Sequence, residues 1–317
     1  MDNNLPARGG SAFGGKKFAP LFIIIAAALW GVDGIVLTPQ LFALPVPLVV
    51  FLNHALAFLF MLPFFLVELK EVKKLKTGDW GAFLWIAVFG GAIGTMAIVK
   101  ALFYVNFVNL SIVILLQKLQ PLFAVTLAWL ILKEKLPKKF FWWSAAALIG
   151  SYFVTFGLAL PNLSTGEKTI AAALFSLLAA FAFGSATVFG KRGLKNTNYR
   201  MGTYLRFGIT SIIMLLIVLA TGDLSQLHNV TAHQLLIFLI IVFTTGGTAI
   251  FLYYWGLKWV TASVSTICEL AFPLIAIILE YLIRGNLLSW AQWVGAVVLA
   301  YSIYKVSALK EGRNIIT

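Results

Sequence analysis

Residues 117–136 read QKLQPLFAVTLAWLILKEKL, and residues 269–288 read ELAFPLIAIILEYLIRGNLL. Each stretch starts with polar residues, carries a proline four positions after its first residue and continues as an apolar run. Pro121 and Pro273 are 152 residues apart, and the same offset aligns Leu122 with Leu274, Leu127 with Leu279 and Leu130 with Leu282. A constant offset of about half the chain predicts an internal repeat, and a repeat decides the architecture.

The repeat extends on both sides of these stretches. Trp30-Gly31 aligns with Phe183-Gly184 at an offset of 153, and Trp142 aligns with Trp293 at an offset of 151. We therefore expect two halves of one fold, residues 18–160 and 169–306, joined by an external linker, 161–168. Tails of residues 1–17 and 307–317 flank them.

The composition places these halves in a membrane. Of 317 residues, 61% are hydrophobic and 11% are charged, whereas soluble proteins carry about 25% charged residues. A helix needs about 20 mostly apolar residues to cross the hydrocarbon core. Ten such runs are present: Phe18–Leu37, Pro45–Val67, Trp80–Tyr104, Val108–Leu132, Phe140–Leu160, Thr169–Gly190, Met201–Ala220, Leu235–Leu257, Ala262–Ile283 and Ser289–Val306.

The basic residues predict the orientation of the ten spans. If both termini are cytoplasmic, 19 of the 24 Lys and Arg residues fall in inner segments, and only Lys168 and Arg284 fall in outer ones. Basic residues collect in cytoplasmic loops, so the net charge of +13 indicates topology and not a nucleic-acid partner. We expect a multi-pass protein of a bacterial or archaeal cytoplasmic membrane.

Because each half has five spans, an odd number, the second half enters the membrane from the opposite side. The predicted fold is thus all-α, with ten transmembrane helices in two inverted five-helix repeats. Many secondary transporters use inverted repeats for alternating access around a site near the midplane.

The chain resembles EamA-type members of the drug/metabolite transporter superfamily over essentially its whole length. The resemblance rests on the aromatic-Gly pairs, the prolines of spans four and nine, and the stretch Leu130–Leu136 with Glu134 at the membrane edge. The second half departs from the family pattern, because it has Asn286 where a Glu is typical. The resemblance implies a transporter of amino acids, other metabolites, drugs or nucleotide sugars, with export the commoner direction.

Titratable side chains deep within spans are costly and therefore informative. Four lie near mid-depth, where one cavity could hold them: Asp33, His54, Lys118 and Glu269. They are candidates for substrate binding or proton coupling. Alternatively, Lys118 with Glu269, or Asp33 with His54, form ion pairs that hold helices together. Lys100 and Arg206 lie near span ends and are expected to snorkel to the interface.

Polar residues beside the prolines complete the candidate site. Gln117 is the repeat equivalent of Glu269, and Ser265 shares a helix face with Glu269. Pro121 and Pro273 each free a backbone carbonyl and are expected to act as hinges. Trp30 lies one turn from Asp33 and is the aromatic candidate for substrate contact. The aromatic clusters at 103–104 and 253–255 are typical of the belts at membrane interfaces. The glycines at 90, 91, 94, 246 and 247 are typical of close contact between helices.

The function classes narrow accordingly. We expect a secondary transporter, with export favoured, of a small metabolite such as an amino acid or another zwitterionic or aromatic solute, with protons as one possible coupling ion. A facilitative, channel-like or uptake carrier for an organic cation or nucleotide sugar is the alternative. An intramembrane enzyme is disfavoured, because His54 is the one histidine within a span and Cys268 the one cysteine. No cofactor or metal is expected; a monomer and a homodimer are both compatible.

Overall fold

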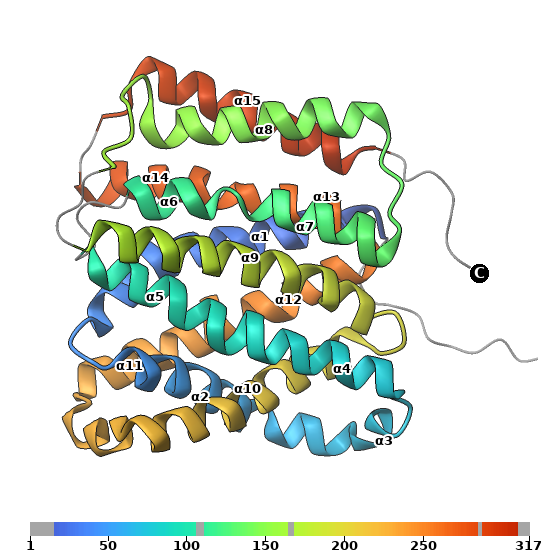
Figure 1. The fold of residues 1–317 in the computed structure, drawn as a ribbon, viewed down its shortest axis with the longest axis vertical. Helices are drawn as coiled ribbons and strands as arrows, with labels where there is room; N and C mark the ends of the chain where they lie inside the picture. Colours follow the sequence, from blue (N-terminus) through green and yellow to red (C-terminus); the bar gives the residue numbers. More distant parts are fainter. Residues whose placement is uncertain (1–15, 106–110, 164–167, 285–286, 310–317) are drawn as a thin grey trace, which may run out of the picture.

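The computed structural model describes residues 16–105, 111–163, 168–284 and 287–309, and this part of the chain is helical throughout, with connecting turns. The first half contains α1 (Ala19–Val32), α2 (Val46–Val67), α3 (Leu69–Val72), α4 (Thr77–Trp85), α5 (Gly94–Tyr104), α6 (Ser111–Gln117), α7 (Gln120–Leu127) and α8 (Lys138–Phe156). The second half contains α9 (Thr169–Gly193), α10 (Tyr199–Thr221), α11 (Ala232–Ile241), α12 (Gly247–Trp259), α13 (Ala262–Cys268), α14 (Phe272–Arg284) and α15 (Trp290–Ser307). The helices stack as roughly aligned rods (Figure 1).

The expected spans are present as helices. Eight segments are long and apolar enough to cross a membrane: 19–41, 46–67, 77–104, 112–132, 169–193, 199–221, 232–259 and 262–279. The pair α8 and α15, of 19 and 18 residues, completes the ten and forms one edge of the bundle (Figure 1). The fifth span ends at Phe156 and not at Leu160, because Gly157 follows with a φ of 59°, which terminates a helix.

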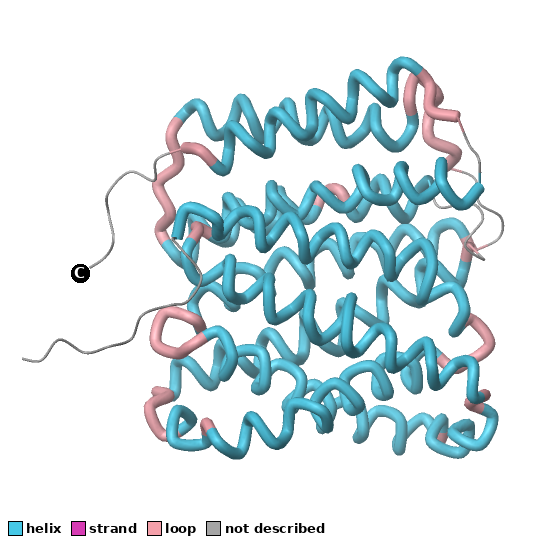
Figure 2. Tube along the Cα trace, turned by 180° about the vertical axis from the view of Figure 1, so that it is seen from behind, coloured by secondary structure: helices cyan, strands magenta, loops and turns pink. Residues whose placement is uncertain are grey.

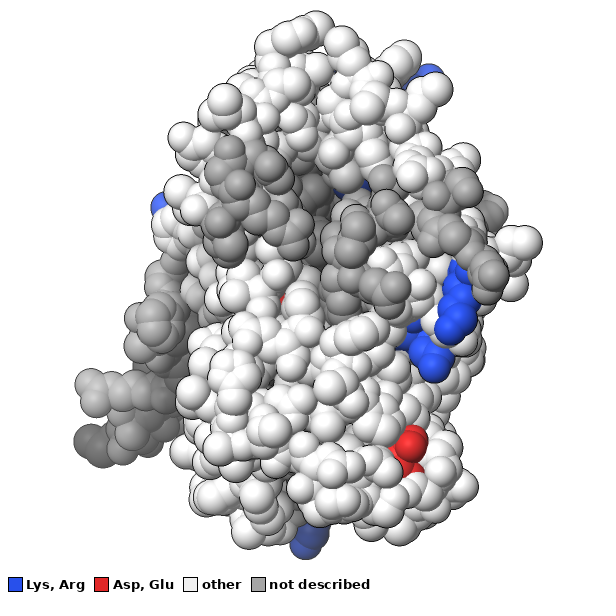
Figure 3. Space-filling model, turned by 90° about the vertical axis from the view of Figure 1, so that its left-hand side faces the viewer, with Lys and Arg blue, Asp and Glu red and all other residues white. Residues whose placement is uncertain are grey.

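The tube view shows that the connecting loops gather at the two ends of the bundle (Figure 2). We call the end at which α1 begins and α15 ends the terminal end, and the other the opposite end. Figure 3 looks at the opposite end, where the visible surface carries few charged side chains and is hollowed near its centre. Asn286 and both tails up to residue 15 and from residue 310 lie outside the described residues.

The contacts of the aligned glycines in spans one and six explain why both halves have a glycine at this position. A Cβ on Gly31 would lie 3.3 Å from the carbonyl oxygen of Phe272, and one on Gly184 would lie 2.9 Å from that of Gln120. Phe272 and Gln120 are themselves 152 residues apart. Each glycine therefore lets a helix of one half approach the proline-containing span of the other half, and the two halves interlock by equivalent contacts.

Spans three and eight contain a second pair of equivalent features, a π-helical turn in each half. From the sequence, the glycines of these turns were expected only to allow close helix contact. The π-helical turns η4 (Ile86–Ile93) and η7 (Val242–Gly246) precede α5 and α12. Thr95 donates to the carbonyl of Gly90 at 3.3 Å, and Thr248 donates to that of Phe243 at 2.7 Å. The two donors, Thr95 and Thr248, are 153 positions apart, and so are the two acceptors, Gly90 and Phe243. A threonine side chain thus closes the widened turn in both halves.

The glycines at these turns have a specific backbone role. A Cβ on Gly94 would lie 2.6 Å from the carbonyl oxygen of Phe89, and one on Gly247 would lie 2.5 Å from that of Val242. In a π turn the chain widens by one residue, which brings a carbonyl under the glycine. A Cβ on Gly94 would also lie 3.1 Å from Ala182 Cβ of α9, and one on Gly247 would lie 3.1 Å from Met61 Cε of α2. Both the local turn and the neighbouring helix therefore exclude a side chain at these two positions.

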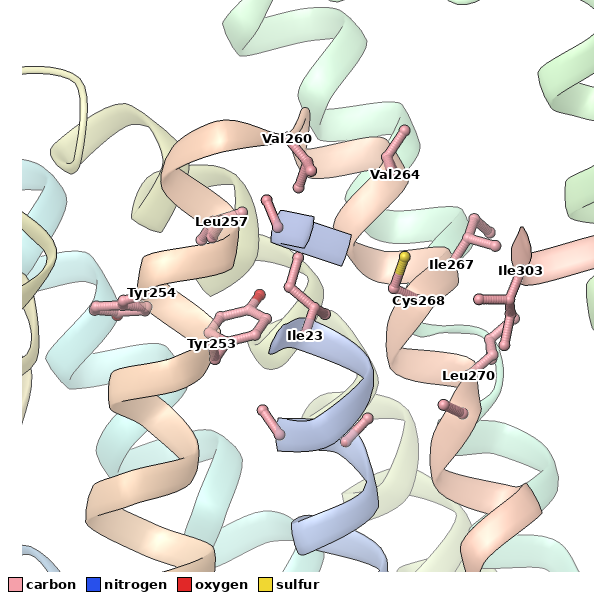
Figure 4. Packing of buried hydrophobic residues seen from close by; sticks show 14 of the residues in the cluster. Ile23, Tyr253, Tyr254, Leu257, Val260, Val264, Ile267, Cys268, Leu270 and Ile303 are labelled. Atoms are coloured by element: carbon pink, nitrogen blue, oxygen red, sulfur yellow. The ribbon is translucent and has the colours of Figure 1, made fainter. Parts of the chain in front are cut away.

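The largest buried cluster lies between α1, α12 and α13. Ile23 is fully buried and packs with Tyr253, Leu257 and Cys268, which Figure 4 shows around α1. Tyr253 and Tyr254 are 3% and 0% exposed. The expectation of an interfacial belt at 253–254 is therefore wrong, because both rings point into the bundle where α1 and α10 cover them.

Candidate functional site

The candidate site forms where spans four and nine are interrupted. Span four breaks at Lys118-Leu119, between α6 and α7, and Pro121 lies in the first turn of α7. Span nine breaks in the 3-10 turn η8 (Glu269–Ala271), between α13 and α14, just before Pro273. Proline lacks an N–H and cannot continue the hydrogen-bond ladder of the preceding turn. The two prolines therefore place a helix break at equivalent depths in the two halves.

Glu269 is the centre of a polar cluster at the break of span nine. Its carboxylate accepts hydrogen bonds from Gln120 Nε2 at 2.6 Å and from the Tyr253 hydroxyl at 2.9 Å. Ser265 Oγ donates at 3.2 Å and Thr187 Oγ1 lies at 3.5 Å. All four partners are uncharged, and none of the ion pairs between described residues involves Glu269. Among the described residues the Glu269 carboxyl therefore has neutral donors as partners and no counter-ion.

Gln117 joins this cluster through Gln120. Its Nε2 donates to Gln120 Oε1 at 3.2 Å, and Gln120 in turn donates to Glu269. The other end of the Gln117 amide, Oε1, is buried and has no hydrogen-bond partner within the described part of the chain. A buried amide oxygen without a donor is costly, so this atom is a candidate contact for a donor group on a substrate.

An aromatic pair borders the same cluster. The rings of Trp30 and Tyr253 lie 5.3 Å apart between centroids at an angle of 57°, and Trp30 is half-buried. Tyr253 also contacts Thr187 at 2.8 Å between their oxygens. Trp30, Gln117, Ser265 and Glu269, all predicted from the sequence, are thus linked by direct contacts through Tyr253 and Gln120.

The other three titratable candidates find separate partners. Lys118 Nζ donates to Ser151 Oγ at 2.8 Å, so Lys118 turns toward α8 and makes no ion pair with Glu269. Asp33 accepts from Thr38 Oγ1 at 3.1 Å, and His54 Nδ1 lies 2.8 Å from the carbonyl oxygen of Val50. Neither of the helix-bridging ion pairs proposed from the sequence is present among the described residues.

His54 has a further relation to the repeat. Its ring lies 5.4 Å from that of Phe207 between centroids, and these two residues are 153 positions apart. Residues related by an internal two-fold axis meet only where the axis passes between them. His54 and Phe207 therefore mark the axis of the bundle, where α2 and α10 cross.

Arg206 differs from its expected position at the membrane interface. It is 9% exposed, and its guanidinium donates to the carbonyl oxygen of Gly90 at 3.1 Å and to the Tyr254 hydroxyl at 3.5 Å. Gly90 lies in the π turn η4, and its carbonyl oxygen gives the guanidinium an acceptor inside the bundle. The expectation of snorkelling is wrong for this residue because a backbone acceptor replaces water.

Glu134, the membrane-edge residue of the family resemblance, crosses to the other half. It accepts from the backbone N–H groups of Ala262 and Ser263 at 2.8 and 3.1 Å and from the Ser263 hydroxyl at 2.6 Å. Lys133 has a left-handed backbone, φ 57°, which ends the helix and turns Glu134 back toward the bundle. The carboxylate therefore ties the end of span four to the start of span nine.

Two more carboxylates join the halves at this terminal end. Asn196 Nδ2 donates to Asp79 at 2.9 Å, and Arg200 Nη1 lies 3.2 Å from Glu68. Glu68 and Asp79 belong to the first half, and Asn196 and Arg200 to the second. With Glu134, three acidic residues of the first half hold donors of the second half at the terminal end, where the first half begins and the second half ends.

Sequence reasoning missed Gln120, Tyr253 and Thr187 as members of the site. Gln120 directly precedes Pro121, so the polar residue next to the break was a usable signal. Tyr253 and Thr187 offered none, because hydroxyl and aromatic residues are common in spans, and their contact with Glu269 depends on helices far apart in sequence.

Comparison with known proteins supports a transporter fold. A crystal structure with 15% identity superposes with a TM-score of 0.71 over 96% of this chain and 99% of that one, which shows a shared fold. The protein described as riboflavin transporter ImpX from Fusobacterium nucleatum is 50% identical over 290 residues, 91% of this chain and 97% of its own. The uncharacterized transporter YwfM from Bacillus subtilis is 29% identical over 295 residues, 91% and 93% of the two chains.

The repeat is visible to this comparison as well. The EamA-like transporter family matches twice, at residues 17–156 and 170–308. These ranges correspond to the two halves joined by equivalent glycine contacts in the fold. The chain is a member of the EamA-like transporter family, a multi-pass membrane transporter and not an enzyme.

Proposed function

We propose that this chain transports riboflavin through the bundle, using the cluster around Glu269 as its binding site. The observation that carries the proposal is the 50% identity to a riboflavin transporter over 97% of that protein's length. The match covers 91% of this chain, so the bundle interior that we propose as the binding site lies within the matched length.

The chemistry of the site suits such a ligand. Riboflavin has a flat, conjugated ring system whose pyrimidine edge carries one N–H between two carbonyls, and a chain of hydroxyls. Trp30 and Tyr253 offer aromatic faces for the ring. Gln117 and Gln120 offer amide groups, whose donors and acceptors match an imide edge. Riboflavin carries no phosphate group, so its binding does not require several basic side chains, and Lys118 as the single basic residue at the two breaks is sufficient.

The transport mechanism that we propose is alternating access between the two ends of the bundle. The breaks at Pro121 and Pro273 act as hinges, and the glycine contacts at Gly31 and Gly184 slide during the exchange. Equivalent contacts in inverted halves give two conformations of similar energy, which is the physical basis of this mechanism.

A zwitterionic substrate, expected from the sequence, is the second candidate. One observation favours it: Lys118 faces Ser151 and no carboxylate, so its ammonium remains able to receive a substrate carboxylate. In this arrangement Glu269 receives the amino group. The two groups belong to the adjacent breaks of spans four and nine.

Reconstituted vesicles distinguish the two candidates. Purified protein is inserted into liposomes, and uptake of radiolabelled riboflavin is compared with uptake of labelled amino acids and of flavin mononucleotide. We expect saturable riboflavin flux that unlabelled riboflavin inhibits and that flavin mononucleotide inhibits weakly. Amino-acid flux without riboflavin flux would replace the first proposal by the second.

A further inference from the structure

Three side chains form a continuous line of hydrogen bonds that ends on an unpartnered atom. Gln117 Nε2 donates to Gln120 Oε1 at 3.2 Å, and Gln120 Nε2 donates to Glu269 Oε2 at 2.6 Å. At the far end, the buried oxygen of the Gln117 amide accepts no hydrogen bond from any described residue. The line crosses from span four to span nine, and thus from one half of the molecule to the other.

The ionisation of Glu269 dictates the direction of every bond in this line. An ionised carboxylate can only accept hydrogen bonds, so Gln120 must present its NH₂ group to Glu269. Its carbonyl oxygen then faces Gln117, which must present its own NH₂ group. Only the Gln117 oxygen is left over, which agrees with the position of the unpartnered acceptor.

A proton on Oε2 of Glu269 would reverse this order. Gln120 contacts Oε2, whereas the hydroxyls of Tyr253, Ser265 and Thr187 contact Oε1. The O–H that Oε2 would gain on protonation is therefore matched by the oxygen of Gln120. The Gln120 amide then turns its NH₂ group to Gln117, and the Gln117 amide turns to accept it with its oxygen. The group left over at the end of the line becomes the Gln117 NH₂, a donor.

We propose that Gln117 and Gln120 are an amide relay that converts the protonation of Glu269 into a change of the group offered to the substrate. With Glu269 ionised, the relay offers an acceptor, which takes an N–H donor such as the imide of a flavin ring. With Glu269 protonated, it offers a donor and repels the same N–H. The flavin part of this inference rests on the proposed function; the relay itself does not.

The surroundings leave Glu269 as the group that sets the relay. The titratable side chain that contacts it from a neighbouring helix is Tyr253 of α12, whose hydroxyl donates to it, and Cys268 precedes it in the chain. Ser265 and Thr187, from α13 and α9, are not titratable. Lys118, the nearest cation along span four, is bonded to Ser151 of α8. Among the described residues no cation forms an ion pair with Glu269.

Infrared difference spectroscopy tests the relay without any substrate. The purified protein, with ¹³C-labelled glutamine side chains, is titrated with acid, and the amide C=O bands are followed together with the carboxyl band of Glu269. We expect glutamine bands to shift in the same pH interval as the carboxyl band in the natural sequence, and to stay fixed in Glu269→Gln. Glutamine bands that do not move with the carboxyl band would overturn the relay.

Two further variants separate the relay from general damage. Gln120→Leu interrupts the line, so the remaining glutamine bands should lose their pH response while the carboxyl of Glu269 still titrates. Gln226→Leu removes a glutamine of the exposed turn η6 (Asp223–Asn229) and should keep the full response of the natural protein. A response that survives Gln120→Leu contradicts the relay, even if that variant is otherwise well folded.

Ligand binding tests the second half of the inference. Riboflavin affinity, measured by quenching of its fluorescence, should fall by about five-fold when Glu269 becomes protonated, the effect of about one hydrogen bond. Riboflavin methylated at its imide nitrogen should lack this pH dependence, and so should Gln120→Leu. Equal pH dependence for the methylated ligand overturns the N–H assignment. No riboflavin binding at any pH refutes the proposed function, and the infrared titration still decides the relay.

Discussion

The breaks of spans four and nine have the same backbone and different chemistry. Each lies just before a proline, at positions 152 residues apart, and each receives a glycine-containing helix from the other half. Gln117 and Gln120 occupy the positions of Glu269 and Phe272. One break thus carries neutral amides and the other a carboxylate. The comparison teaches that the repeat fixes where the chain bends, whereas single divergent residues fix what each bend can bind.

Removing the carboxylate tests this difference with the largest expected effect. Glu269→Gln loses a group that four neutral donors surround, and hydrogen bonds to a charged group contribute about 1.5–3 kcal/mol each. We expect the initial rate of vesicle flux to fall more than about ten-fold. Glu71→Gln, at an exposed ion pair with Lys74, is the matched control and should transport normally. Flux at the natural rate in Glu269→Gln would remove this residue from the mechanism.

The glycine contacts test whether the two breaks are mechanically equivalent. Gly184→Ala places a Cβ 2.9 Å from the backbone oxygen of Gln120, whereas Gly31→Ala places one 3.3 Å from that of Phe272. Overpacking costs about 1–3 kcal/mol, so Gly184→Ala should lower the unfolding temperature in detergent more than Gly31→Ala. Gly81→Ala, where no atom lies within 4 Å of the new Cβ, is the control. The reverse order for the two glycines would contradict the contact geometry.

Tyr253→Phe sharpens the chemical side of the comparison. The variant keeps the ring beside Trp30 and removes the hydroxyl that donates to Glu269 at 2.9 Å. One hydrogen bond to a charged acceptor is lost, so substrate affinity should weaken about ten-fold, by roughly 1.5 kcal/mol. Titration calorimetry with the transported solute measures it. Tyr152→Phe, on α8 and outside the site, provides the control; an equal loss there would point to nonspecific damage.

Exchanging the charges of Lys118 and Glu269 between the two breaks has the smallest expected effect on flux. If Lys118 and Glu269 formed a direct ion pair, the double variant Lys118→Glu with Glu269→Lys would restore that pair with its charges reversed and would rescue flux. Because Lys118 bonds to Ser151 and not to Glu269, we expect no rescue relative to the single variants. Recovery of flux to more than half of the natural rate would mean that the two residues do pair during transport.

The spans, the repeat and the depth of the breaks were all predictable. Runs of about 20 apolar residues and prolines are local features, and their physical consequences act within a few residues. The predicted boundaries match the helices within about four residues: span one runs on to Leu41 and span five ends at Phe156. Val108, the predicted start of span four, lies outside the described residues. The positions of Glu269, Gln117 and Ser265 near one break follow from the same local rules.

The partners of the polar residues were not predictable in the same way. Gln120 and Glu269 are 149 positions apart, Lys118 and Ser151 are 33 apart, and Arg206 and Gly90 are 116 apart. Apolar spans offer few sequence signals for which faces meet, because helix contact in lipid depends on shape and on isolated polar groups. Lys118 was placed beside Glu269 by depth alone, and depth does not determine the direction in which a side chain points around its helix.

The sequence by itself determined that this chain is a ten-span transporter built from two inverted halves. Length, hydropathy, charge asymmetry and the constant offset between the two halves are properties of the chain. They do not depend on which helices contact one another. Only the tertiary structure decided that the halves interlock through Gly31 and Gly184, that Glu134 crosses between them, and that Gln120 and Tyr253 meet Glu269. Those contacts depend on helix rotation and on close approach of backbones, which arise when all spans assemble together.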